Sequence, residues 1–144
     1  MKPFPHHYTV EALATPTGSV ELKGEKLPAI LSAPPIEFDG PGDQWSPEDL
    51  LVASVIDCFA LTFRAIAHAS QVSWSSLRCY AEGSLDRVEH VSRFVTMRIG
   101  AELVLTEGGD TERGKRLLEK AEKTCLITNS LDLHVELDAK VTTS

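Results

Sequence analysis

The feature that most constrains this fold is a long apolar run, LLVASVIDCFALTFRAIAHA, at residues 50–69. Ser46 before it can cap a helix, Pro47 suits the first helical position, and Asp49 falls where a capping box wants an acid. The run is apolar on nearly every face, which predicts a helix buried on most sides. Such a helix spans roughly 30 Å at 1.5 Å per residue. A chain of 144 residues offers too little structure to enclose it, so we expect a partner subunit.

Charge and composition exclude several classes of protein. The net charge of −7 argues against a nucleic-acid partner, because phosphate binding needs a basic surface, and also against an anionic membrane surface. The apolar run is near membrane-spanning length, but Asp57 and Arg64 lie near its middle, where charges are costly in lipid. We therefore expect no membrane partner and no nucleic-acid partner.

The compartment is predicted from the N-terminus and the cysteines. The first residues, MKPFPHHYTV, contain no apolar segment of the kind found in a signal peptide. The three cysteines are widely spaced and odd in number, which is not a disulfide framework. We expect reduced thiols and a cytoplasmic location.

The rest of the chain predicts an α+β fold. A capped second helix begins in GGDTERGKRLLEKAEKT, with Asp110 or Thr111 as its cap and Leu117, Leu118 and Ala121 facing inward. A loop is expected at 33–45. Alternating apolar residues predict strands at 8–14, 19–23 and 29–32, a long antiparallel hairpin at 74–88 and 93–106, and a closing strand with one wet face in 131–141. No linker divides the chain, so residues 1–144 are expected to form a single domain.

Two cysteines stand in settings that suit redox chemistry. Cys58 lies inside the apolar run, and Cys125 opens the segment CLITNSL directly after the second helix. A two-cysteine peroxidase needs one thiolate to attack the peroxide and a second thiol to close a disulfide. A short helical turn at Cys125 would favour its thiolate through backbone N–H groups. The alternative for Cys58 is a small buried hydrophobe, and we interpret Cys79 as structural.

At this point the residues resemble a known family. The segment SPEDLLVASVIDCFALTF is similar to the long helix of the osmotically inducible protein C (OsmC) family, in which a cysteine follows a glutamate by ten positions. Glu48 and Cys58 have that spacing. The segment AEKTCLITNSL resembles the family's second cysteine segment, around Cys125. The order of strands and helices also fits, so the resemblance covers most of the chain.

The resemblance implies both a fold and an activity. It implies an OsmC-like fold, with antiparallel sheets wrapped around a long buried central helix in an intertwined homodimer. It implies reduction of organic hydroperoxides, with Cys58 as the peroxidatic cysteine, Cys125 as the resolving cysteine and Glu48 as a polar partner. The resulting disulfide would be reduced by an external dithiol, such as dihydrolipoamide, and no bound cofactor is needed.

The chain also departs from the family's pattern. The family's peroxidases use an arginine from the N-terminal strands to support the thiolate, whereas the first arginine of this chain is Arg64. Lys23 or Lys26 is a candidate substitute, although lysine lacks the bidentate guanidinium. Arg64 is another candidate, but it lies six residues from Cys58 on a different helical face, so it could reach only a partner's site or follow a bent-back path. Asp57 precedes the first cysteine, and a nearby negative charge raises a thiol pKa. Leu126 replaces the usual proline after the second cysteine.

Distance along the helix bears on Glu48. Ten residues place it about 15 Å from its own Cys58, so a shared site requires a break in the helix or a partner subunit. An acid in the first turn is also ordinary helix capping. The histidines show no zinc-ligand spacing, and we expect no metal site.

Two rival functions remain open from the sequence. One keeps the fold without the activity, as an OsmC-like protein that binds a small apolar or thiol ligand. The other is a hot-dog thioesterase, which also wraps a long apolar helix in a sheet and dimerises but would not need two cysteines.

Overall fold

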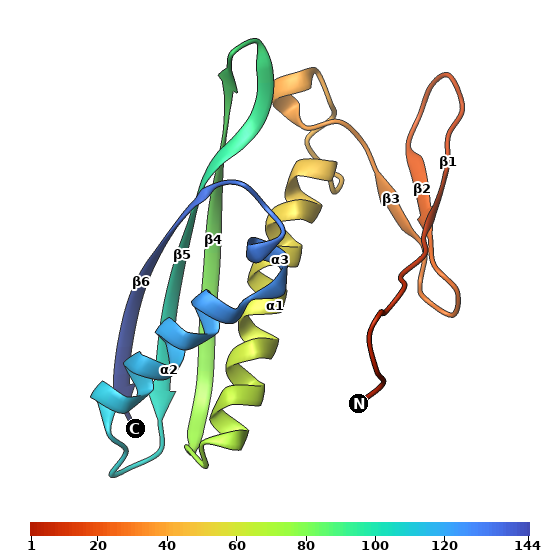
Figure 1. Ribbon diagram of the computed structural model, residues 1–144. Coiled ribbons are helices and arrows are strands. Elements are labelled where there is room, and N and C mark those ends of the chain that lie inside the picture. The colour runs from red at the N-terminus through yellow and green to blue at the C-terminus, as the bar shows by residue number, and fades with distance from the viewer. The chain divides into compact units, whose positions relative to one another are not determined.

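The computed structural model describes all 144 residues and has the α+β class that the sequence predicted (Figure 1). The chain forms two compact units, Met1–Leu51 and Val52–Ser144, with the boundary inside the long helix α1 (Pro47–Ala69). We describe each unit in turn.

The unit Met1–Leu51 holds a small antiparallel sheet in the order β1-β2-β3. Its strands are β1 (Glu11–Leu13), β2 (Val20–Lys23) and β3 (Ile30–Ser32). The predicted strands at 19–23 and 29–32 are confirmed. The first strand is shorter than the predicted 8–14, because only residues opposite Glu21 to Lys23 find partners in β2.

The loop expected at 33–45 contains one short helical element. A 3₁₀-helix, η1 (Ile36–Phe38), follows Pro35 and ends at Asp39, whose φ of 61° lies in the left-handed region. The prolines and glycines around it make the segment 33–45 irregular otherwise. The loop prediction is therefore correct except for this single turn.

Helix α1 begins with the predicted capping box. Ser46 Oγ accepts a hydrogen bond from the Asp49 backbone N–H at 3.0 Å. Asp49 Oδ2 accepts from the Ser46 backbone N–H at 3.2 Å and from the Ser46 hydroxyl at 2.8 Å. These reciprocal bonds satisfy N–H groups that the first turn of a helix otherwise leaves unpaired.

Within one chain, α1 buries a single stripe rather than most of its surface. The buried residues Val55, Phe59, Phe63 and Ala67 recur every four positions along the helix. Another apolar side chain of the same helix, Leu61, is 50% exposed. The expected burial on most sides is thus not provided by this chain alone.

The unit Val52–Ser144 is built on a three-stranded sheet in the order β4-β5-β6. The predicted hairpin is confirmed, with β4 (Trp74–Val88) antiparallel to β5 (Val91–Leu105). Its two turn residues, Glu89 and His90, have φ values of 51° and 68°. Positive φ at both positions is the signature of a type I′ turn, whose twist suits a two-residue hairpin.

The last strand differs in direction from the expected antiparallel sheets. Strand β6 (His134–Thr143) pairs parallel to β5, from Thr96 opposite His134 to Leu105 opposite Thr143. The sheet is therefore mixed. The segment between the two strands contains helices, and such a crossover returns the chain to the end of the sheet where β5 began.

That crossover holds α2 (Thr111–Thr124) and α3 (Leu126–Asn129). Asp110 caps α2 as predicted, accepting hydrogen bonds from the backbone N–H groups of Glu112 at 3.1 Å and Arg113 at 3.2 Å. The inward face of α2 is also confirmed, and its buried residues include Leu117, Leu118 and Ala121.

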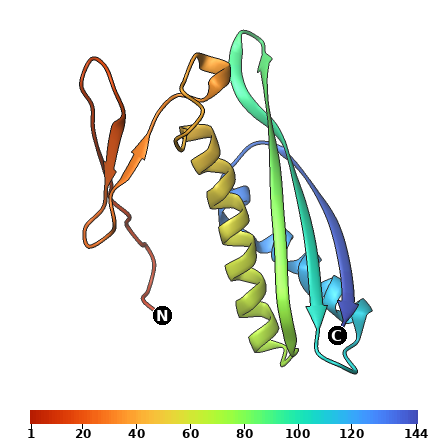
Figure 2. The same ribbon diagram turned by 180° about the vertical axis from the view of Figure 1, so that it is seen from behind.

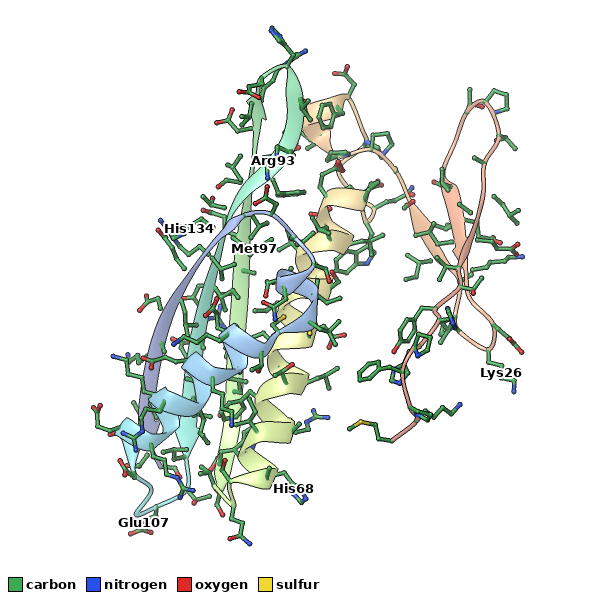
Figure 3. The ribbon with its side chains drawn as sticks, in the orientation of Figure 1. Lys26, His68, Arg93, Met97, Glu107 and His134 are labelled. Carbon is green, nitrogen blue, oxygen red and sulfur yellow. The ribbon has the colours of Figure 1, made fainter.

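Both long helices of this unit cover the same face of the sheet. Alternate residues of β5 are buried between strands and helices: Met97, Ile99, Ala101, Leu103 and Leu105. Figure 2 shows the strands from the opposite side, with α2 behind them. Met97 points from β5 toward the helices (Figure 3). The buried stripe of α1 belongs to the same cluster.

Helix α1 is also long and apolar enough to cross a membrane by length and composition. The core helix of a soluble protein meets the same criteria. Its stripe from Val55 to Ala67 packs against the sheet, and Asp57 and Arg64 are charged residues within it. We therefore describe α1 as a core helix.

The strained hairpin turn gives a stability prediction. Replacing Glu89 by Asn and His90 by Gly should raise the free energy of unfolding by about 1 kcal/mol, because these residues adopt positive φ more readily. Urea denaturation measures this change. The matched control, Glu89→Ala with His90→Ala, removes the same side chains and should not stabilise the protein; equal stabilisation by both pairs would contradict the turn assignment.

Candidate active site

Cys58 and Cys125 meet within the unit Val52–Ser144. Cys58 lies near the middle of α1 and is half-buried, whereas Cys125 lies between α2 and α3 and is fully buried. Their thiol groups form a hydrogen bond with each other. Figure 1 shows α3 beside the middle of α1, which is how the crossover brings Cys125 to Cys58.

The Cys58 sulfur lies among hydrogen-bond donors. The backbone N–H groups of Leu126 and Ile127, in the first turn of α3, both point to it. The Thr62 hydroxyl, one turn further along α1, lies 3.8 Å from the sulfur. Together with the Cys125 thiol, these groups form a cluster of four donors around one sulfur atom.

These donors decide the protonation of Cys58. Burial raises the pKa of its thiol, but hydrogen bonds from Ile127 N–H, the Cys125 thiol, the Thr62 hydroxyl and Leu126 N–H lower it, and the net pKa lies below the ordinary thiol value. A thiolate accepts hydrogen bonds more strongly than a thiol does, so the donors favour the charged form. Cys58 is therefore the better nucleophile of the pair.

Cys125 has the opposite tendency. Burial raises the pKa of its thiol, and the hydrogen bonds with the backbone and side chain of Thr128 lower it only in part, while neighbouring Cys58 raises it further. Cys125 thus keeps its proton and donates a hydrogen bond to the Cys58 sulfur. The predicted short helical turn after Cys125 is present as α3, but its first N–H groups act on Cys58.

Asp57 does not act on Cys58 as its position in the sequence suggested. Burial raises the pKa of the Cys79 thiol, and the negative charge of Asp57 raises it further. Adjacent residues on a helix point about 100° apart, so Asp57 is turned away from the Cys58 sulfur, and its charge acts on Cys79 of β4. Cys79 is a free, half-buried thiol in that strand.

No lysine or arginine takes part in lowering the Cys58 pKa. Lys23 Nζ pairs with Glu21 at 3.1 Å, and Lys26 lies at the β2–β3 turn, where its side chain extends away from the strands (Figure 3). Arg64 is exposed on α1. The groups that lower the Cys58 pKa within this unit are all uncharged hydrogen-bond donors.

The sequence alone indicated one of the hydrogen-bond donors to Cys58. Thr62 follows Cys58 by four residues in a predicted helix, and such positions are neighbours on one face. The N–H groups of Leu126 and Ile127 could not be assigned from the sequence, because their approach to Cys58 depends on how the crossover packs. They are the functional groups that the sequence reasoning missed.

Glu48 is not brought to the cysteine pair within the helix that carries it. It lies in the first turn of α1, which continues unbroken past Cys58 and so separates the two by about 15 Å along the axis. Its Oε1 is buried and has no hydrogen-bond partner. A break in the helix is thus excluded as a way to join Glu48 with its own Cys58.

No group of three or more histidine, cysteine, aspartate or glutamate side chains is arranged to hold a metal ion. The chemistry available at this site is that of two neighbouring thiols. One favours the thiolate and the other retains a proton, so nucleophilic attack followed by disulfide formation needs no further reactive group.

Comparison with known proteins identifies the family. Residues 40–140 match the family of OsmC-like proteins, which is more than half of the chain. The chain belongs to the OsmC-like family. Among curated proteins, YmaD of Bacillus subtilis, described as uncharacterized, is 26% identical over 106 residues, covering 72% of this chain and 71% of its own length.

Solved structures share the OsmC-like fold. An OsmC-like protein of unknown function from Vibrio cholerae superposes with a TM-score of 0.86 at 15% identity, over 94% of this chain and 99% of that one. An organic hydroperoxide resistance protein from Legionella pneumophila gives a TM-score of 0.75 at 22% identity, over 96% and 99%. At these identities the likeness establishes the fold.

The donor cluster predicts how Cys58 responds to pH. Thr62→Val removes one donor, so the Cys58 pKa should rise and the pH midpoint of its alkylation by iodoacetamide should move upward. We expect the alkylation rate at pH 7 to fall by about tenfold, as for loss of a hydrogen bond to a charged group. Mass spectrometry of the peptide containing Cys58 measures the rate.

Thr124→Val is the matched control for this experiment. Its hydroxyl donates to Lys120 O at 2.8 Å and takes no part in the contacts of Cys58. The control should leave the alkylation profile of Cys58 unchanged. An unshifted profile in Thr62→Val would show that the Thr62 hydroxyl does not stabilise the thiolate.

Proposed function

We propose that this OsmC-like protein reduces organic hydroperoxides through Cys58 and Cys125. The observation that carries the proposal is the hydrogen-bonded thiol pair with opposite pKa tendencies. A peroxidatic cysteine must be a thiolate, and its resolving partner must lie close enough to form a disulfide. The family membership and the name of the Legionella relative support the same activity.

The proposed reaction has three steps. The Cys58 thiolate attacks the distal oxygen of the hydroperoxide, the O–O bond breaks, and the alkoxide takes a proton from solvent and leaves as an alcohol. The resulting Cys58 sulfenic acid condenses with Cys125, which forms the disulfide and releases water. An external dithiol, with a lipoyl group as a candidate, then reduces the disulfide by thiol–disulfide exchange. No cofactor takes part.

The proposed assembly is a homodimer of single OsmC-like domains, each comprising residues 1–144. Support comes from the exposed apolar side chains, which include Leu31, Phe38, Trp45 and Leu61. Such surface normally marks an interface. Glu48 is proposed as the polar partner of the other subunit's cysteine pair, because its own helix carries it away from Cys58. We place the protein in the cytoplasm.

A second candidate is an OsmC-like protein that binds a small apolar or thiol ligand without turning over peroxide. The absence of any arginine or lysine from the Cys58 contacts favours this alternative, because an adjacent cation is a strong activator of a thiolate. The hot-dog thioesterase considered from the sequence does not apply, because the chain has the OsmC-like fold.

The peroxidase proposal predicts a defined mass change. One equivalent of cumene hydroperoxide, added to the reduced protein without a reductant, should lower the intact mass by about 2 Da as the disulfide forms. Peptide mapping should locate the bond between Cys58 and Cys125. An unchanged mass would instead favour the ligand-binding alternative.

Single variants separate the roles of the two thiols. Cys58→Ser should abolish peroxide consumption, whereas Cys125→Ser should consume one equivalent and stop at a Cys58 sulfenic acid that dimedone traps. Cys79→Ser is the matched control and should behave as the wild type. Peroxide turnover by Cys58→Ser would refute the mechanism.

The dimer proposal predicts the mass in solution. Sedimentation equilibrium should give twice the 15.7 kDa of one chain. Leu61→Glu should weaken the association by at least tenfold, because it places a charge on the exposed apolar face of α1. Leu61→Met keeps an apolar side chain of similar volume and should remain dimeric. A monomeric wild type at micromolar concentration would contradict the proposal.

A further inference from the structure

Cys125 is enclosed by its own chain, whereas Cys58 is not. Cys125 is fully buried between α2 and α3, and Cys58 on α1 is half-buried. A partner subunit can only add to the burial of Cys125. The proposed peroxidase reaction requires, in contrast, that a hydroperoxide reach the Cys58 sulfur. Of the two sulfur atoms in the disulfide, the one open to an external thiol is therefore that of Cys58.

The direction of approach to Cys58 follows from displacement at sulfur, in which the incoming and leaving atoms lie on opposite sides. When Cys125 closes the disulfide, it displaces the oxygen carried by Cys58, so that oxygen lies on the side away from Cys125. A thiol that opens the disulfide at Cys58 displaces Cys125 and enters from this same side. The hydroperoxide oxygen and the sulfur of the reductant thus use one position.

The departure of Cys125 is opposed by its surroundings. Burial raises the pKa of Cys125, whereas the pKa of Cys58 is lowered by its hydrogen-bond donors. A thiol of lower pKa leaves a disulfide faster, so the accessible sulfur is joined to the poorer leaving group. Reduction at Cys58 therefore needs donors that stabilise the Cys125 thiolate as it forms.

Thr128 in α3 supplies such donors. Its side chain is buried, and both its N–H group and its hydroxyl act on the Cys125 sulfur, against the burial that raises the pKa of this thiol. The hydroxyl also lies 3.1 Å from the Cys125 backbone O. That oxygen accepts a second hydrogen bond, from Asn129 N–H at 3.0 Å. The hydroxyl proton can therefore turn to a charged sulfur and leave the carbonyl paired.

We propose that the external dithiol attacks Cys58 in the position of the hydroperoxide oxygen, and that Thr128 is the hydrogen-bond donor to the departing Cys125. This inference rests on the proposed function. The dithiol's thiolate bonds to the Cys58 sulfur, the Cys58–Cys125 bond breaks, and its electron pair leaves with Cys125. The second thiol gives its proton to Cys125 and attacks the dithiol sulfur bound to Cys58. This step closes the oxidised dithiol ring and releases Cys58 as a thiolate.

A monothiol probe locates the attacked sulfur. Diamide joins Cys58 to Cys125 in the full-length protein without any hydroperoxide, and 2-mercaptoethanol then opens the disulfide one step at a time. Peptic mapping of acid-quenched samples should find the 2-mercaptoethanol adduct on Cys58 and a free thiol at Cys125. An adduct found chiefly on Cys125 would overturn the proposal.

The use of diamide separates this inference from the proposed function. An adduct on Cys58 in a protein that cumene hydroperoxide does not oxidise would refute the peroxidase reaction and leave the attack at Cys58 standing. Oxidation by cumene hydroperoxide, followed by an adduct on Cys125, would refute this inference alone.

Substitutions of Thr128 test its part in the reaction. Thr128→Val removes the hydroxyl, so the rate constant for adduct formation should fall by about tenfold, as for loss of a hydrogen bond to a charged group. Thr128→Ser keeps the hydroxyl and should react like the wild type, which separates loss of the donor from loss of packing. Thr124→Val, whose hydroxyl donates to Lys120 O, is the control and should leave the rate unchanged.

Two results of this series would contradict the proposal. An unchanged rate in Thr128→Val would show that its hydroxyl does not stabilise the leaving thiolate. A larger loss in Thr62→Val than in Thr128→Val would show that Cys58, and not Cys125, leaves first.

Discussion

The contact between the buried stripe of α1 and the sheet is the constraint on which the rest of this unit depends. Phe59 and Phe63 are fully buried against β5 and its neighbours, and this fixes the rotation of α1 about its axis. Successive residues differ by about 100°, so Cys58 is turned aside from the sheet. That direction leads to α3, where its hydrogen-bond donors lie.

The crossover between β5 and β6 supplies the second half of the site. A parallel pairing requires the chain to return to the start of β5, and the returning segment carries α2, Cys125 and α3 over the helix-covered face. The crossover therefore accounts both for the parallel direction of β6 and for the position of the donors around Cys58. An antiparallel closing strand would have needed no such crossover, and would have given Cys58 no α3.

Stabilisation of a thiolate by hydrogen bonds differs physically from stabilisation by an arginine. Neutral donors act at short range and leave the net charge of the site unchanged, whereas a guanidinium adds a full charge whose field extends further. Each pKa unit corresponds to about 1.36 kcal/mol. In this chain the N–H groups of Leu126 and Ile127 and the Thr62 hydroxyl act against the effect of burial on the Cys58 pKa.

The unit Met1–Leu51 raises a different question, because its strands have only three or four residues each. A sheet so small needs an apolar face to pack against. Its exposed apolar residues, among them Leu13, Ile30 and Leu31, show that the unit does not provide this packing for itself. The outer face of α1 likewise lacks apolar side chains of the same chain to pack against.

The sequence by itself determined most of the elements and the starts of the two long helices, because these depend on neighbours along the chain. Ser46 and Asp49 predicted the start of α1, Asp110 the start of α2, and alternation the hairpin from Trp74 to Leu105. The two cysteines were found from their local settings and the motif spacing. Short-range hydrogen bonds and hydrophobic periodicity depend only on which residues are close to one another in the sequence.

Only the tertiary structure decided how these elements act together. The parallel direction of β6, the effect of Asp57 on Cys79 and the unpaired oxygen of Glu48 all depend on segments distant in sequence or on local packing. The Cys58 pKa is lowered in part by backbone N–H groups, which every residue but proline possesses and no sequence pattern distinguishes. Their role arises from position in space, since a donor acts on a thiolate only where the fold brings it within reach.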